Sequence, residues 1–333
     1  MSEKRARFQA VLEGQPVERV PTGFWYHFFK DELVDATSQA DLIADNVTGH
    51  QQFISAFTPD FIKLMSDGYF HYPNAANWRT ASDDALLAVT SIGQDHVWLT
   101  EQVALVKAQH AQFSEDIFSF YNLFAPATYL KFALGGDDQL VDFVNGHSQA
   151  AIQHLFDIVS HDIAALAVAV IKQGGADGIY YSTQNIQSTS DQTIFNTWIK
   201  PSDVAVLKAA KAAGGTNILH ICGYEGASNR LTDFSDHPAD IVNWATAVEG
   251  VPLAQGRAIF PTQVLLGGFG NTTQDVLYQG TPEEIAATTQ AIIKEFGDDT
   301  RFLIGADCTV PRDIDLNHLA AARQAAVRQP ITA

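Results

Sequence analysis

Three consecutive stretches near the end of the chain decide the fold: "QVLLGGF" (263–269), "GTPEEIAATTQAIIKEFG" (280–297) and "RFLIGADC" (301–308). The first and third are short apolar runs, which are typical of strands buried on both faces. The second has helical spacing, with Thr281 as its N-cap and Gly297 just past its end. Together they predict a strand, a crossover helix and a second, parallel strand.

The same alternation extends along the whole chain. Helical patterns separate the apolar runs, and the charged pattern "MSEKRARFQAVLEG" precedes the first of them. Eight repeats of strand and helix predict an α/β fold, a closed (β/α)8 TIM barrel formed as one domain over residues 1–333 with an N-terminal helical extension. A doubly wound open sheet is the alternative, because the pattern alone does not prove closure. The predicted strands are 19–27, 60–66, 124–130, 176–183, 217–223, 239–245, 263–269 and 301–308.

Charge and composition exclude several classes of function. The 333 residues include 20 Lys and Arg against 38 Asp and Glu, a formal net charge of -18, and the cations form no cluster. Nucleic acid and anionic membranes are therefore not expected partners. The chain has no glycine-rich nucleotide motif, so a nucleotide cofactor lacks support. A charged N-terminus and only two cysteines predict a cytoplasmic protein with reduced thiols.

Both cysteines fall where predicted strands end. In an extended "NILHIC" (217–222), His220 and Cys222 point the same way because side chains alternate along a strand, and Cys308 ends the last strand. The carboxyl ends of barrel strands open on one face, so these three side chains are expected to meet there.

One imidazole and two thiolates suit zinc, and a set of three protein ligands leaves a fourth position open, as in catalytic sites. Zinc in such a site would hold a substrate thiol as a nucleophilic thiolate, which predicts alkyl transfer to sulfur. The alternative is that both cysteines are small buried hydrophobes and His220 is an ordinary core residue.

Several further stretches resemble one known family, in the same order and over nearly the whole chain. They are "PVERVP", "TPDFIKLMSDGYF", "GGADGIYYS", "ILHICG", "LLGGFGNTT", "GTPEEI" and "FLIGADCTVP", followed by an asparagine in "DIDLNHLAAA". The chain is thereby similar to the uroporphyrinogen decarboxylase superfamily, whose fold is a TIM barrel. That superfamily includes zinc methyltransferases that move a methyl group from a corrinoid protein to a thiol such as coenzyme M. The resemblance to this branch lies in the pattern H-x-C followed far downstream by C, here His220, Cys222 and Cys308.

The true decarboxylases differ from this chain in the segment that binds the carboxylates of their substrate. They carry an arginine-rich segment after the first strand, because a tetrapyrrole with eight carboxylates needs bidentate cations. Here that segment reads "GFWYHFFKDE", with aromatic residues and His27 instead. Phe132 stands where they have a tyrosine, with Tyr129 close by, and Cys308 stands where they have a histidine. Asp67 matches their aspartate that binds the pyrrole NH groups.

The leading hypothesis is thus a zinc methyltransferase with His220, Cys222 and Cys308 as ligands, a small thiol as acceptor and a methylated corrinoid protein as donor. The alternative is decarboxylation of a tetrapyrrole with Asp67 central and no metal. Asp67 is predicted to act as a general acid or base or to bind substrate, with an Asp-Gly turn as the structural alternative. Lys63, deeper in the same strand, is predicted to form a structural ion pair. The predicted substrate-binding residues at the mouth are His27, Tyr180, Ser182 and Gln184.

Overall fold

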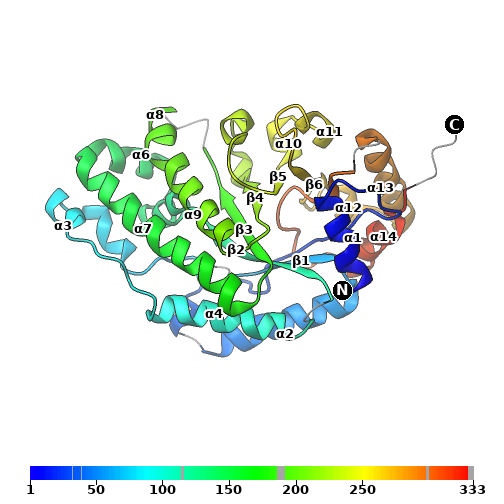
Figure 1. Cartoon of the computed structure of the whole chain (residues 1–333), viewed down its shortest axis with the longest axis horizontal. Helices are drawn as coiled ribbons and strands as arrows, with labels where there is room; N and C mark the ends of the chain where they lie inside the picture. Colours follow the sequence, from blue (N-terminus) through cyan, green and yellow to red (C-terminus); the bar gives the residue numbers. More distant parts are fainter. Residues whose placement is uncertain (32, 39, 114–115, 186–191, 298–299, 329–333) are drawn as a thin grey trace.

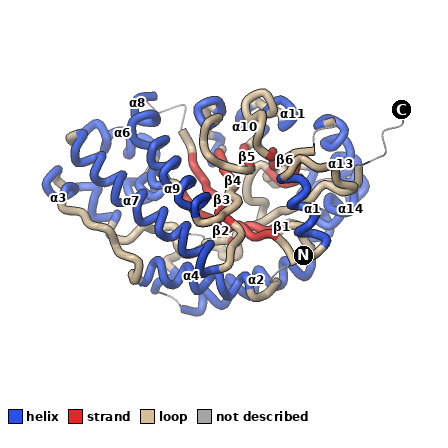
Figure 2. The backbone as a smooth tube through the Cα atoms, in the orientation of Figure 1, coloured by secondary structure: helices blue, strands red, loops and turns tan. Residues whose placement is uncertain are grey.

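The protein is described by a computed structural model over residues 1–328, except positions 32, 39, 114–115, 186–191 and 298–299. Its centre is a parallel sheet of seven strands in which each strand pairs with the next one along the chain. Figure 2 shows these strands as a curved row with helices around them. The strands are β1 (Phe61–Leu64), β2 (Phe118–Phe124), β3 (Gly178–Thr183), β4 (Ile218–Ile221), β5 (Ile241–Trp244), β6 (Val264–Phe269) and β7 (Phe302–Ala306).

Helices connect successive strands and cover the outside of the sheet (Figure 1). The predicted capping box is present at the start of α13, where Thr281 and Glu284 bond each other's backbone N–H groups. The helices are α1 (Glu3–Leu12), α2 (Ala40–Phe57), α3 (Asp83–Leu87), α4 (Val97–His110), α5 (Pro126–Leu134), α6 (Asp137–Gly146), α7 (Gln149–Ala169), α8 (Gln192–Ile194), α9 (Lys200–Ala212), α10 (Thr246–Glu249), α11 (Leu253–Gly256), α12 (Val276–Gln279), α13 (Pro282–Phe296) and α14 (Leu316–Ala325).

The predicted first strand, 19–27, is not a strand in the structure. Its backbone makes two isolated bridges, an antiparallel one from Arg19 to Val327 and a parallel one from Thr22 to Ile304 of β7. Gly23 N–H donates to Ile304 O at 3.0 Å, and Asp60 N–H donates to Thr22 O at 3.0 Å. This segment therefore lies between β7 and the start of β1, but an eighth strand is not formed. The fold is a curled seven-stranded parallel sheet with surrounding helices, consistent with a TIM-barrel-like architecture.

The predicted strand at 124–130 is wrong as well. The strand lies one segment earlier, at β2, and "PATYLKFAL" forms helix α5 with Pro126 at its first position. Pro fits there because the first N–H of a helix has no partner within the helix. Gly135 ends α5 with a φ of 109°, a left-handed conformation that favours glycine. A short apolar run next to a proline does not distinguish these two structures.

Alternation along the strands divides the core into an inner and an outer part. Tyr180 belongs to the cluster inside the curled sheet, whereas its neighbour Tyr181 packs outside and donates its hydroxyl to Asp203 of α9 at 2.7 Å. Helix α1 closes the amino-terminal end of the sheet, because the rings of Phe8 and Phe118 stack with centroids 4.6 Å apart. This is the predicted N-terminal helical extension.

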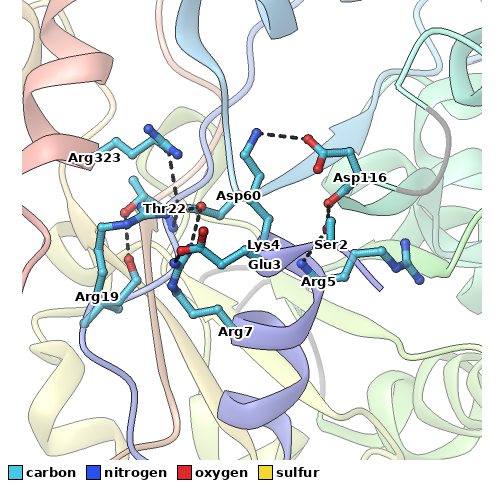
Figure 3. Close-up of polar contacts among 11 residues, drawn as sticks. Ser2, Glu3, Lys4, Arg5, Arg7, Arg19, Thr22, Asp60, Asp116 and Arg323 are labelled. Carbon is cyan, nitrogen blue, oxygen red and sulfur yellow. Dashed lines mark hydrogen bonds and ion pairs between the residues drawn. The ribbon is translucent and has the colours of Figure 1, made fainter.

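A buried carboxylate ties the segments at the amino-terminal end of the sheet together (Figure 3). Asp60 is fully buried and accepts two hydrogen bonds from Arg19, at 2.6 and 2.5 Å. Arg7 of α1 and Arg323 of α14 each lie 3.6 Å from the same carboxylate. These contacts stabilise one end of the sheet, while the opposite end carries the candidate site.

Helix α7 and the turn that follows it form the most apolar helical segment. Within the part of the chain that the structure describes, Gln149–Gly174 is the one helix long and apolar enough to cross a membrane by length and composition, and 56% of its tested window is buried inside the protein. Its packing against α3 and α9 explains the apolar surface.

Candidate metal centre

The structure brings His220, Cys222 and Cys308 together. His220 lies in β4, Cys222 follows that strand, and Cys308 follows β7. Their ligand atoms all lie within 4.8 Å of one another, and Cys308 Sγ is 3.4 Å from His220 Nε2. His220 is buried and both cysteines are half-buried, unbridged thiols. One imidazole and two thiols at this spacing fit a zinc ion with an open coordination position.

Asn243 of β5 fixes the protonation of His220. Its amide nitrogen donates to the carbonyl oxygens of Leu266 and Ala306, at 2.9 and 3.2 Å, which sets the orientation of the amide. Its Oδ1 therefore accepts, and it lies 2.6 Å from His220 Nδ1. The proton of neutral His220 must then be on Nδ1, so Nε2 offers its lone pair on the side of Cys308. This is the support that a metal-ligating histidine requires.

Sequence reasoning missed Asn243. The available signal was a polar residue within the apolar run "ADIVNWA", two positions after an inward-facing isoleucine, Ile241. Tyr180 also contributes here, because its hydroxyl donates to Asn243 Oδ1 at 2.8 Å. Tyr180 is fully buried, and burial raises the pKa of its hydroxyl. The structure thus places Tyr180 against the ring of His220, with centroids 5.1 Å apart; its contact with substrate stays a prediction.

The two thiols influence each other's protonation. A hydrogen bond from Cys222 lowers the pKa of Cys308 well below its usual value, and the nearby His220 and Lys63 act in the same direction. The same hydrogen bond, together with burial, raises the pKa of Cys222. Of the two sulfurs, Cys308 is therefore the one that becomes a thiolate first.

The backbone of Cys222 is held from both sides. Its N–H donates to Thr183 O at 2.9 Å, and its carbonyl accepts from Gln184 Nε2 at 2.9 Å and from Asn229 Nδ2 at 2.8 Å. The other end of the Gln184 amide accepts a hydrogen bond from Lys131. Both ends of the Gln184 amide therefore have partners within the protein, and its role as a substrate ligand stays a prediction.

Ser182 lies next to the centre. In the parallel register of β3 and β4 it pairs with His220, so both side chains point to the same side of the sheet. Its side chain is buried at the inner surface. Its predicted contact with substrate is not tested by the structure.

Asp67 and His27, both predicted from the sequence, form a pair. Asp67 Oδ1 lies 2.7 Å from His27 Nδ1, and Phe28 N–H donates to Oδ2 at 2.7 Å. Gly68 follows with a φ of 93°, so the Asp-Gly turn is also present. The Asp67 side chain is fully buried, whereas that of His27 is 25% exposed. With the carboxylate as acceptor, the proton of a neutral His27 lies on Nδ1.

The His27 pair lies on a segment that runs beside the one carrying Cys308. Val310 N–H donates to Trp25 O at 3.0 Å, and Arg312 Nη1 donates to Phe28 O at 3.4 Å. Among the described residues, however, the group that could hold a metal contains only His220, Cys222 and Cys308. The Asp67 pair is therefore a separate polar feature.

The fold and the site together define an α/β protein with an imidazole and two thiols at the carboxyl end of its parallel strands. Comparison with family models gives the family: the model for uroporphyrinogen decarboxylase matches residues 99–329, more than half of the chain, so the chain belongs to this family. A search of curated proteins finds no significant match.

Solved structures of similar fold include methyl-transferring proteins. A methyltransferase from Methanosarcina mazei has a TM-score of 0.70 and 13% identity, with 98% of each chain covered. A B12-independent methionine synthase from Shewanella sp. W3-18-1, solved in complex with selenomethionine, has a TM-score of 0.56 and 14% identity, covering 92% of this chain and 97% of that one. At these identities the likeness shows the fold. With the family match, it supports an enzyme of this superfamily with methyltransferase-type neighbours.

Proposed function

We propose that this protein is a zinc-dependent methyltransferase that transfers a methyl group from a methylated corrinoid protein to a small thiol. The observation that carries the proposal is the spacing of the His220, Cys222 and Cys308 ligand atoms, all within 4.8 Å of one another. Zinc held by this set would lower the pKa of the acceptor thiol and keep its sulfur nucleophilic at neutral pH.

The chain's own residues prepare the centre for this chemistry. Asn243 holds the proton of His220 on Nδ1, which leaves Nε2 free to bind the metal. Gln184 and Asn229 hold the backbone carbonyl of Cys222, which fixes the position of its main chain beside the group. His220 is buried, so charge interactions at its imidazole are less screened by water than at the surface.

Metal analysis is the first test of this proposal. Protein purified without chelator should carry about one zinc per chain. Cys222→Ser, Cys308→Ser and His220→Asn should each lose most of it. His154→Asn is a matched control, because His154 bonds the backbone of Val89 away from the centre. Zinc retained by all three centre variants would contradict the proposed site.

A transfer assay tests the reaction itself. Methylcobalamin and a series of small thiols would be mixed with the zinc-loaded protein, and loss of the methylcobalamin absorbance and formation of the thioether would be followed together. Methyl transfer should require both zinc and Cys308. A zinc-loaded protein that methylates no thiol in the series, with free methylcobalamin or with a corrinoid protein, would count against the proposal.

Decarboxylation of a tetrapyrrole without metal is the second candidate, favoured by the family match and by the buried Asp67. A polyanionic substrate requires several cations at the mouth. Arg79, Arg230 and Arg312 bond three different groups of the protein: Arg79 donates to Ala133 O, Arg230 to the Gln192 side chain, and Arg312 to Phe28 O. Turnover of uroporphyrinogen to coproporphyrinogen by metal-free protein, abolished in Asp67→Asn, would establish this alternative.

A further inference from the structure

We propose that Lys63 is a positioning residue that favours the anionic form of the acceptor thiol over its neutral methylated product at the metal centre. This inference rests on the proposed function. It assigns a specific task to a buried cation beneath the centre and defines the acceptor as a thiol that loses its proton when it binds.

Lys63 faces the interior of the curled sheet. Its neighbours at alternate positions in and after β1, Phe61 and Met65, both belong to the inner hydrophobic cluster. Lys63 is only 5% exposed, and its Nζ lies 4.3 Å from the centroid of the Tyr180 ring and 5.8 Å from that of Trp25. The faces of these aromatic rings attract a cation.

The position of Lys63 couples its charge to the centre. Tyr180, whose ring lies under the ammonium group, also packs against His220 and bonds Asn243. The single ring of Tyr180 therefore separates the ammonium group of Lys63 from the imidazole of His220. A cation on the inner side of the sheet is weakly screened by water.

The charge of Lys63 affects the bound thiolate and the bound thioether differently. Zinc held by His220 and the thiolates of Cys222 and Cys308 would leave the group without net charge, and an acceptor bound as a third thiolate would bring the charge to about -1. The acceptor would give its S–H proton to solvent on binding. Its methylated form would be a thioether without charge, so the group would be neutral again. The positive charge of Lys63 therefore stabilises the complex with the bound thiolate more than the complex with the neutral thioether.

The test compares two ligands that differ by one methyl group, 2-mercaptoethanol and 2-(methylthio)ethanol, binding to zinc-loaded protein by calorimetry at pH 7. In Lys63→Met, which keeps an unbranched apolar stem, thiol affinity should fall about tenfold while thioether affinity changes by less than about twofold. Lys63→Arg keeps the charge and should retain most of the thiol affinity. Zinc content should be the same in all three proteins.

The outcomes separate this inference from the proposed function. If wild-type protein binds no zinc, or binds thiol and thioether equally when loaded, the proposed function fails. If the wild type prefers the thiol to the thioether and Lys63→Met shows the same preference, the proposed function stands and only the role of Lys63 is overturned. Loss of zinc from a folded Lys63→Met would also overturn it, because a positioning charge is not a ligand. Lys63→Gln provides the same comparison should the Met variant fail to fold.

Discussion

The Oδ1 atom of Asn243 lies 2.6 Å from Nδ1 of His220, and this contact decides which nitrogen of the imidazole can bind a metal. The contact joins β5 to β4, and the Asn243 amide nitrogen extends it to β6 and β7. The centre is therefore positioned by four neighbouring strands, although only two of them lead to a ligand.

Replacing Asn243 should weaken zinc binding without removing a ligand. In Asn243→Leu, His220 loses the acceptor that orients its ring, and zinc affinity should fall about 10- to 100-fold. Competition with a chromophoric chelator measures this affinity. Asn317→Leu, at an exposed position of α14, is the control and should bind zinc as the wild type does. An unchanged affinity in Asn243→Leu would show that the ring is oriented by other contacts.

Metal-free protein should form a disulfide between Cys222 and Cys308 when treated with hydrogen peroxide. The sulfurs lie within 4.8 Å, and Cys308 is the thiol with the lowered pKa, which makes it the one that peroxide attacks first. Two S–H bonds break, one S–S bond forms, and the peroxide is reduced to water. Mass spectrometry should find a loss of two hydrogens, absent in Cys222→Ser and slowed by bound zinc. Stable oxidation of Cys308 alone in the wild type would contradict the expected pairing.

Asp60 and Asp116, both drawn in Figure 3, should differ in their contribution to stability. Asp60 is fully buried among arginines, so Asp60→Asn should lower the free energy of unfolding by about 3 to 5 kcal/mol. Asp116, which pairs with Lys4 at 3.2 Å and is 54% exposed, is the control, and Asp116→Asn should cost less than about 1 kcal/mol. Urea unfolding at pH 7 measures both. Equal losses would show that burial does not set the contribution of Asp60.

His50 should make the protein sensitive to acid. Burial lowers its pKa from 6.5 to about 4, and its Nε2 accepts the N–H of Met65 at 3.0 Å. A lowered pKa in the folded state stabilises the protein above pH 6.5, and this stability is lost as the pH falls toward 4. Between pH 7 and about pH 4.5, the free energy of unfolding of His50→Gln should therefore fall by about 2 kcal/mol less than that of the wild type. Urea unfolding at both pH values measures this difference. His154→Gln, a half-buried control, should behave like the wild type; an equally acid-sensitive His50→Gln would refute the assignment.

The grouping of His220, Cys222 and Cys308 could be predicted because it depends on two regular features. Side chains alternate along a strand, and parallel strands end at a common edge. The local sequence was therefore sufficient to predict that these three side chains lie close together. Asp67 and His27 were each named as site residues from the sequence, but their contact with each other was not predicted, and their roles remain predictions.

Other features depend on contacts between distant segments, which the sequence does not display. Asn243 looks like an isolated polar residue until its partners on three other strands are known. The pattern of segment 19–27 predicts a strand, yet Pro21 has no N–H to donate, and the segment forms only two isolated bridges, one on either side of this proline. Local pattern likewise placed a strand at 124–130, where Pro126 begins a helix.

Because Cys222 follows β4 and Cys308 follows β7, the ligand set is complete only once the segment after β7 has been synthesised. A nascent chain that has not yet emerged beyond residue 308 offers only an imidazole and one sulfur, a weak chelate. Metal loading would therefore act as a check on completed folding, and truncated chains released early from the ribosome would be left without their ion.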